Sequence, residues 1–135
     1  MLHTLRSLID NDVLWFEIIK GIANDFKYNT VDGQQIINYI NEKSETELTY
    51  FFNQYLKNKE IPELQYNLQK EGRNYNLIYR WNAIPEFDMP ILINTGFKDF
   101  WIYPNFEWKE LDLGSFDNHD FKVRDDLFFI DIKKQ

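Results

Sequence analysis

Two histidines and the carboxylates near them are the residues of this sequence whose types could support chemistry. His119 stands in the polar stretch SFDNHDF with Asp117 and Asp120, which could offer one nitrogen and two oxygens to a metal ion. Ser115, His119 and Asp120 could also be written as a Ser–His–Asp trio, but no nucleophile-elbow pattern surrounds Ser115. Neither His119 nor His3 has a second histidine within one helical turn. We therefore expect a solvated turn around His119 and a packed helical histidine at His3.

Other catalytic patterns are weak. The five glycines are scattered, so no glycine-rich phosphate loop is present, and the lack of cysteine excludes thiol catalysis. Glu86 with Asp88, and Asp125 with Asp126, are acidic pairs between predicted strands, where solvated turns are more common than catalytic pairs. We expect no catalytic residue and no metal or cofactor site in this chain. A standalone enzyme that uses the acidic loops is a third hypothesis beside the two developed below.

The charge distribution limits the classes of partner. With 22 acidic and 15 basic residues the formal net charge is −7, and Lys and Arg are dispersed along the chain. No basic stripe is available to neutralise phosphates, so we expect no nucleic-acid partner. No apolar run approaches the roughly 20 residues that span a bilayer. The composition leaves the cellular compartment open.

The spacing of apolar residues predicts an α+β fold, with an N-terminal helical subdomain of about four helices followed by a small antiparallel β-sandwich. Apolar residues recur every three to four positions up to residue 60, with Asn11 or Asp12 as a predicted N-cap. Thr30 is the predicted N-cap of a later helix, and Ser44 with Glu47 predicts a capping box for the next. The expected units are residues 1–60 and 61–135.

A change of period marks the second unit. After Pro62 apolar residues alternate, turn around Gly72 and alternate again, which is typical of a β-hairpin. Four further stretches predict short strands separated by proline and glycine, and strands at this spacing favour a sandwich or half-barrel. These stretches are MPILIN, DFWIYP, EWKELDL and FFIDIKK.

Three motifs, in this order, resemble the alanyl aminopeptidase (aminopeptidase N) family of zinc aminopeptidases: MLHTLR at 1–6, LTYFFNQYL at 48–56 and IPELQY at 61–66. The resemblance is close over the first half of the chain and looser over the strands. It implies that residues 1–60 are the helical tail of a gluzincin catalytic domain and that 61–135 are its β-sandwich domain.

The same resemblance places the zinc chemistry outside this chain. In the family, the HExxH helix, the distal glutamate and the tyrosine that stabilises the tetrahedral intermediate precede the position of Met1. The chain would then be a non-catalytic C-terminal fragment that buttresses the catalytic domain and substrate cleft of an enzyme removing N-terminal residues from peptides. The remainder of that enzyme is the implied partner, zinc is its cofactor, and bacterial parents are often exported or membrane-associated.

The opening helices carry apolar residues from the very first position. When the neighbour is missing, apolar helix faces that were shaped to pack on it must be covered by other protein, dimerise or fray. These residues are predicted to contact the missing domains, or to form a homodimer; the alternative is that they close on Phe51, Phe52 and the sandwich. The predicted interface residues are Leu2, Leu5, Ile9, Trp15 and Phe16.

The aromatic-rich stretch DFWIYPNFEW supports a different hypothesis, an independent β-sandwich module that binds peptide or carbohydrate. Side chains of a strand alternate between its two faces, so the five rings of this stretch cannot all point inward. Outward rings could stack on a ligand, with Trp101 and Trp108 as the candidates. The alternative is that they cover the helical half or missing domains.

Overall fold

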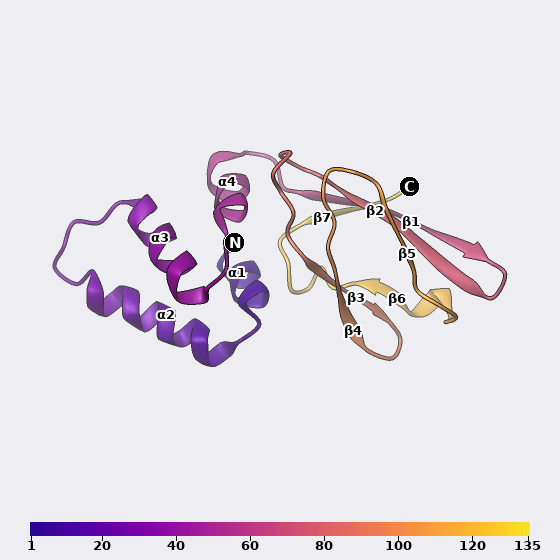
Figure 1. Ribbon diagram of the computed structural model, residues 1–135, viewed down its shortest axis with the longest axis horizontal. Helices are drawn as coiled ribbons and strands as arrows, with labels where there is room; N and C mark the ends of the chain where they lie inside the picture. Colours follow the sequence, from indigo (N-terminus) through magenta and orange to yellow (C-terminus); the bar gives the residue numbers. More distant parts are fainter.

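The computed structural model describes residues 1–135, in which four helices are followed by seven strands (Figure 1). The helices are α1 (Leu2–Ile9), α2 (Asp12–Asp25), α3 (Gly33–Ser44) and α4 (Thr49–Lys57). The strands are β1 (Glu63–Glu71), β2 (Asn74–Asn82), β3 (Ile91–Thr95), β4 (Asp99–Ile102), β5 (Lys109–Asp112), β6 (Phe121–Val123) and β7 (Asp131–Lys134), with a short 3-10 helix η1 (Asn118–Asp120) before β6. The predicted α+β fold class is confirmed.

The helix starts follow local hydrogen bonding. The Asn11 side chain accepts a hydrogen bond from the Leu14 N–H, which confirms the predicted cap of α2. The prediction of Thr30 as the cap of α3 is wrong, because the helix begins at Gly33 and Asp32 is its N-cap. Asp32 and Gln35 satisfy each other's backbone N–H groups in a reciprocal capping box, a pairing that Thr30 cannot make.

The capping box predicted from Ser44 and Glu47 is also wrong. Ser44 is the last residue of α3, and α4 begins only at Thr49. The backbone N–H groups at this start are instead satisfied by Asn41, which accepts from Leu48, and by Glu47, which accepts from Thr49. Asn41 of the preceding helix α3 therefore caps the start of α4, the role that the motif predicted for Ser44.

The strands form two sheets. The first has the order β5–β2–β1–β7 and the second β4–β3–β6. The predicted hairpin of β1 and β2 is confirmed, with Leu64 opposite Trp81 and Tyr66 opposite Tyr79. Gly72 adopts a φ of 64° in the turn, a conformation in which a side chain would be strained.

Two features of the sheets differ from the sequence expectation in detail. Strand β6 is a three-residue strand that the alternation pattern did not reveal. Strand β7 runs parallel to β1, whereas the other four strand pairs are antiparallel. This direction arises because the chain returns from β6 past α1 and α4 and joins the sheet beside the start of β1, where the Asp131 N–H donates to the Pro62 carbonyl.

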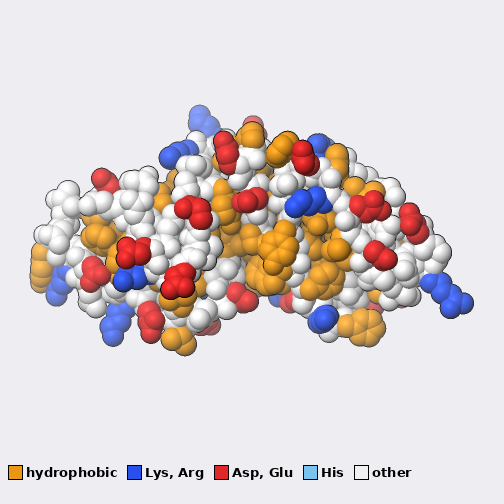
Figure 2. Space-filling view, in the orientation of Figure 1, with side chains coloured by type: hydrophobic (Ala, Val, Ile, Leu, Met, Phe, Trp, Pro, Cys, Tyr) orange, Lys and Arg blue, Asp and Glu red, His pale blue; other side chains and the backbone are white.

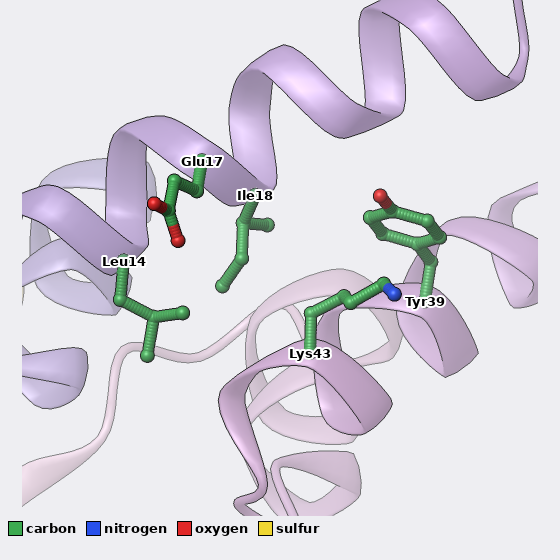
Figure 3. A pocket seen from close by; sticks show the side chains of 5 residues that line it. All are labelled: Leu14, Glu17, Ile18, Tyr39 and Lys43. Carbon is green, nitrogen blue, oxygen red and sulfur yellow. The ribbon is translucent and has the colours of Figure 1, made fainter.

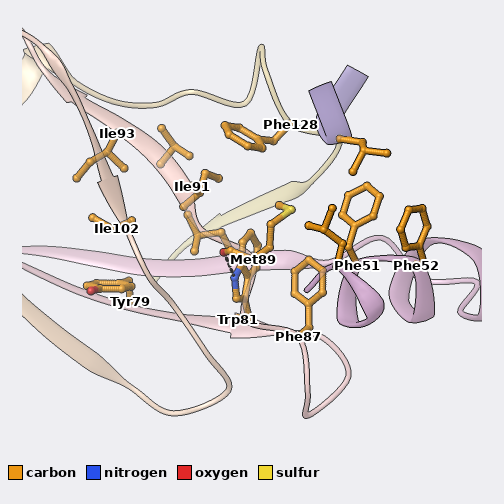
Figure 4. Packing of buried hydrophobic residues seen from close by; sticks show 14 of the residues in the cluster. Phe51, Phe52, Tyr79, Trp81, Phe87, Met89, Ile91, Ile93, Ile102 and Phe128 are labelled. Atoms are coloured by element: carbon orange, nitrogen blue, oxygen red, sulfur yellow. Dashed lines mark hydrogen bonds between the residues drawn. The ribbon is translucent and has the colours of Figure 1, made fainter. Parts of the chain in front are cut away.

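One apolar cluster runs from the sandwich into the helices (Figure 4). Trp81 is buried at its centre and donates a hydrogen bond from its indole nitrogen to the Met89 carbonyl, 2.9 Å away. Phe87 packs edge-on against Trp81 and against Tyr50, so it connects the sheets with α4. Helix α1 reaches the same cluster through Leu5.

Side-chain hydrogen bonds reinforce the junction between helices and strands. Gln54 of α4 is buried; its amide nitrogen donates to the Glu60 carbonyl and its amide oxygen accepts from the Ile84 N–H. Tyr55 donates its hydroxyl to the Phe129 carbonyl, and burial raises the pKa of that hydroxyl. The Phe129 N–H in turn donates to the buried Thr4 hydroxyl of α1, 2.8 Å away. The segment before β7 is thus bonded to both α1 and α4.

None of the four helices combines the length and the apolar character needed to cross a lipid bilayer.

Candidate functional site

The polar turn around His119 is built by its backbone. The Asp117 carboxylate accepts a hydrogen bond from the His119 N–H and so starts η1. The Asp120 side chain packs against Gly96, where an added Cβ would lie 2.8 Å from the Asp120 Cβ. Ser115, His119 and Asp120 are all at the surface. These are the contacts of an exposed turn that docks against the β3–β4 loop.

The remaining candidate groups for chemistry lie apart from that turn. The His3 Nε2 atom lies 3.2 Å from the backbone carbonyl of Asp126, so this histidine contributes to the contact between α1 and the strands. No group of three or more His, Cys, Asp or Glu side chains is arranged to hold a metal ion. Two surfaces of the molecule stand out by their exposed apolar and aromatic side chains.

The first surface is the outer side of α1 and α2. Apolar residues of α2 occupy two sides of the helix, and only one side faces the core, where Trp15 and Ile18 are buried. The other side leaves Phe16 58% exposed, with Leu2 of α1 exposed to the same extent. We call the exposed residues Leu2, Val13, Phe16 and Ile19 the outer helix patch.

The five predicted interface residues differ in how exposed they are. Leu2 and Phe16 are exposed, Ile9 is half-buried, and Leu5 and Trp15 are buried within this chain. A contact with further protein would therefore use Leu2 and Phe16, and that interface stays a prediction. The spacing missed Val13, which is 70% exposed, because a helix with apolar residues on two sides gives no sign of which side faces inward.

Charged groups border the outer helix patch. Arg6 of α1 donates from Nε to an Asp12 carboxylate oxygen 2.8 Å away, and its guanidinium carbon lies 5.2 Å from the centre of the Phe16 ring. The hydrogen bond from Arg6 lowers the pKa of Asp12. Arg6 thereby connects α1 and α2 beside the exposed ring.

An open depression of about 370 Å³ lies between α2 and α3 (Figure 3). Leu14 and Ile18 form its apolar wall, and Glu17 and Lys43 stand at opposite sides. Tyr39 closes one end, and its hydroxyl packs so closely on α2 that a Cβ at position 21 would lie 2.1 Å from it. Burial, and then a hydrogen bond with Asp25, raise the pKa of Tyr39. The depression thus opens between α2 and α3 beside the close contact of Tyr39 with α2.

The second surface is the outer face of the four-stranded sheet. Trp108, just before β5, is 46% exposed, and the Arg80 guanidinium carbon lies 4.5 Å from the centre of its ring. The ring lines a shallow depression of about 330 Å³ together with Asn67, Gln69, Ile78 and Gln135.

Trp101, the other candidate for ligand stacking, is half-buried. Its ring lies edge-on to Phe128 with centroids 6.0 Å apart, and it borders a depression of about 200 Å³ with Leu8 of α1. Figure 2 shows hydrophobic side chains gathered in the middle of this view, over the junction of helices and sheets. Trp101 thus supports the contact between α1 and the second sheet, while Trp108 faces outward.

Comparisons with known proteins identify the fold. No protein-family profile matches the chain, and no curated protein sequence matches it. Among solved structures, the crystal structure of Legionella pneumophila aminopeptidase A in complex with aspartic acid matches with a TM-score of 0.79. The chain has an aminopeptidase-like fold. The match covers 99% of this chain at 16% sequence identity, so it extends over helices and strands alike.

The same match describes how the two chains differ in size. These 135 residues correspond to 17% of the Legionella chain. The chain therefore matches one segment of that larger protein and spans less than a fifth of its length.

Proposed function

We propose that this chain is the non-catalytic C-terminal part of a zinc-dependent aminopeptidase of the alanyl aminopeptidase family. In this proposal α1–α4 complete and buttress the catalytic domain, and the sandwich supports the wall of the substrate cleft. The zinc and the HExxH motif belong to the remainder of the enzyme, which removes N-terminal residues from peptides with a metal-activated water.

The observation that carries this proposal is the aminopeptidase match, which includes nearly the whole chain on both sides of the junction. Two further features support it. The motifs MLHTLR and LTYFFNQYL lie on α1 and α4, and IPELQY leads into β1. The outer helix patch offers apolar side chains for a larger domain to cover.

The isolated chain provides the first test. We expect no hydrolysis of alanyl-p-nitroanilide and less than stoichiometric zinc by elemental analysis. Turnover by the isolated chain together with tightly bound zinc would contradict the proposal. The DNA upstream of the Met1 codon provides an independent test, because an HExxH motif is expected there in the same reading frame.

A substitution compared in two contexts tests the buttress role. Phe16→Gln in the longer enzyme should lower the free energy of unfolding by about 2 kcal/mol or more, because it places an amide against an apolar surface. In the isolated chain the same change should stay within about 0.5 kcal/mol, as for other exposed sites. Tyr28→Gln is the matched control, since Tyr28 is 94% exposed in the α2–α3 loop. Equal effects of Phe16→Gln in both contexts would argue against a covered patch.

The exposure of Trp108 favours a second function, an aromatic-rich module that binds peptide or carbohydrate. This function would use the outer face of the four-stranded sheet, where Trp108 lies, and does not depend on a peptidase parent.

A further inference from the structure

The outer face of the four-stranded sheet has an unusual set of side chains. Because strand residues alternate between faces, burial of Leu64 and Leu77 on the inner face places their neighbours outside. Strand β1 contributes Gln65, Asn67 and Gln69 to the middle of that outer face, with Glu63 and Glu71 at its two ends. The β1–β2 and β1–β7 registers continue the same rows of outward residues into β2 and β7. The outward residues in the middle of β2 are Asn76, Ile78 and Arg80, with Asn74 and Asn82 at its ends.

Trp108 forms a ring platform at the side of this face. The register of β2 and β5 brings it beside Arg80, whose guanidinium lies over the ring. The Arg80 Nε donates to the Gln65 amide oxygen 2.8 Å away, which fixes the guanidinium on the sheet. A cation held against an indole face restricts the orientation of the ring. The exposed part of Trp108 is therefore oriented in advance of any ligand.

The depression next to this ring is apolar at its floor and amide-bearing at its walls. Ile78 and Trp108 supply the apolar surface, and Asn67, Gln69 and Gln135 supply amides. Each amide offers two donors and a carbonyl acceptor, and none of the five lining side chains is charged. The site thus combines a flat aromatic surface with uncharged groups that both donate and accept hydrogen bonds.

This chemistry selects among ligand classes. An anionic ligand would need a Lys or Arg at the depression, but none of its five lining side chains is basic, and the nearby Arg80 guanidinium is engaged by Gln65 and Trp108. Lys133 of β7 lies on the same face beside Gln65 but does not line the depression. A peptide that binds by adding a strand would require a free sheet edge, whereas the depression involves both central strands, β1 and β2. A sugar ring presents C–H groups on its faces and hydroxyls around its rim, which match an indole surrounded by amides.

We propose that Trp108, with Asn67, Gln69 and Gln135 around Ile78, forms a binding site for a neutral oligosaccharide on the outer face of the four-stranded sheet. The ring of Trp108 stacks on one sugar residue, and the amides bond the hydroxyls of that residue and its neighbour. The site is independent of the proposed aminopeptidase role.

Titration of the 135-residue chain with cellohexaose, chitohexaose and maltohexaose tests the site, by calorimetry and by tryptophan fluorescence. At least one of the three should bind with a Kd between about 10 μM and 1 mM, as expected of a shallow site. Binding should be insensitive to salt, because no ion pair is formed. If none of the three binds at about 10 mM, the proposal is overturned.

Substitutions locate the binding on this face. Trp108→Ala should weaken the affinity at least about tenfold, and Trp108→Phe should restore part of it, since both act through stacking. Phe97→Ala is the matched control, because Phe97 is an 87% exposed ring in the β3–β4 loop that does not line the depression. An equal loss in Phe97→Ala and Trp108→Ala would overturn the site.

A second variant tests the amides without touching the ring. Asn67→Ala with Gln69→Ala should weaken binding about threefold to tenfold, as expected for lost hydrogen bonds at an accessible site. Circular dichroism of each variant checks that the sheet has folded. This double variant also decides the proposal if Trp108→Ala fails to fold, because unchanged affinity in it would contradict the amide contacts.

Discussion

The α2–α3 hairpin encloses far fewer large side chains than the rest of the molecule. The body, formed by the sandwich with α1 and α4, has Trp81, Phe51 and Leu5 fully enclosed. The hairpin spans Asp12–Ser44 and contributes only Ile18 to the fully enclosed large side chains. In Figure 1 the hairpin projects from α1 and α4 on the side opposite to the sheets.

This difference shows which region depends on further contacts. Local stability follows buried apolar area, so the body is expected to remain folded when the hairpin opens. The hairpin also carries most of the outer helix patch, which is apolar surface that its own chain leaves uncovered. The predictions below challenge or sharpen this division of the molecule.

The largest effect is expected in the body. Trp81→Ala should lower the free energy of unfolding by about 4 kcal/mol, because it empties a central site and leaves the Met89 carbonyl without its donor. Urea unfolding monitored by circular dichroism measures this change. A loss below about 1 kcal/mol, typical of surface positions, would refute the assignment of Trp81 to the centre of the core.

A smaller and local effect is expected in the hairpin. Ile18→Ala should lower the free energy of local unfolding of the hairpin by about 3 kcal/mol, because Ile18 is the one fully enclosed large side chain of the hairpin. The stability of the body should not change. Hydrogen exchange followed by mass spectrometry should show faster exchange of α2 and α3 amides and unchanged exchange in β1 and β2. Val13→Ala, in the same helix at an exposed position, is the control. Equal acceleration in both regions would mean that the chain unfolds as one unit.

The outer helix patch should affect association more than stability. We expect the isolated chain to dimerise through this patch at high concentration and Phe16→Gln to shift it to monomer, with stability changed by at most about 0.5 kcal/mol. Analytical ultracentrifugation at several concentrations measures the shift. A wild-type chain that is monomeric throughout would remove the homodimer hypothesis.

The smallest effect is expected at the ion pair of Arg124 and Asp126, where the sandwich meets α1. The hydrogen bond from Arg124 lowers the pKa of Asp126 below its ordinary value of 3.8. The folded state then binds a proton less readily than the unfolded state, so this stabilisation is complete above the ordinary pKa and is lost as the pH falls through the folded value. The Tm gap between wild type and Asp126→Asn should be present at neutral pH and vanish in acid. A gap that persists in acid would assign the effect to packing.

Much of the fold was predictable from local patterns. The β1–β2 hairpin follows from two alternating runs that meet at Gly72, and the Asn11 cap from its place before an apolar helix. These features depend on residues close in sequence. The sequence also contained the pair Asp32 and Gln35, with the spacing of a capping box, so the start of α3 could have been placed correctly.

The remaining features depend on distant contacts. The parallel pairing of β7 with β1 joins segments at opposite ends of the strand half, and β6 has too few residues to show alternation. Which side of α2 faces inward is decided by its packing on α3, so Val13 could not be assigned to the surface from spacing alone. The stacking of Arg80 on Trp108 likewise requires the pairing of β2 with β5.

The bond between Thr4 and Phe129 has a consequence for how the chain is made. It connects α1 to a residue 125 positions later, so α1 cannot reach its final packing until Phe129 has also left the ribosome. Until then Leu5 has no complete pocket, and a nascent chain exposes this side chain to solvent and to chaperones. Helix α1 is therefore among the last elements of these 135 residues to reach its final packing.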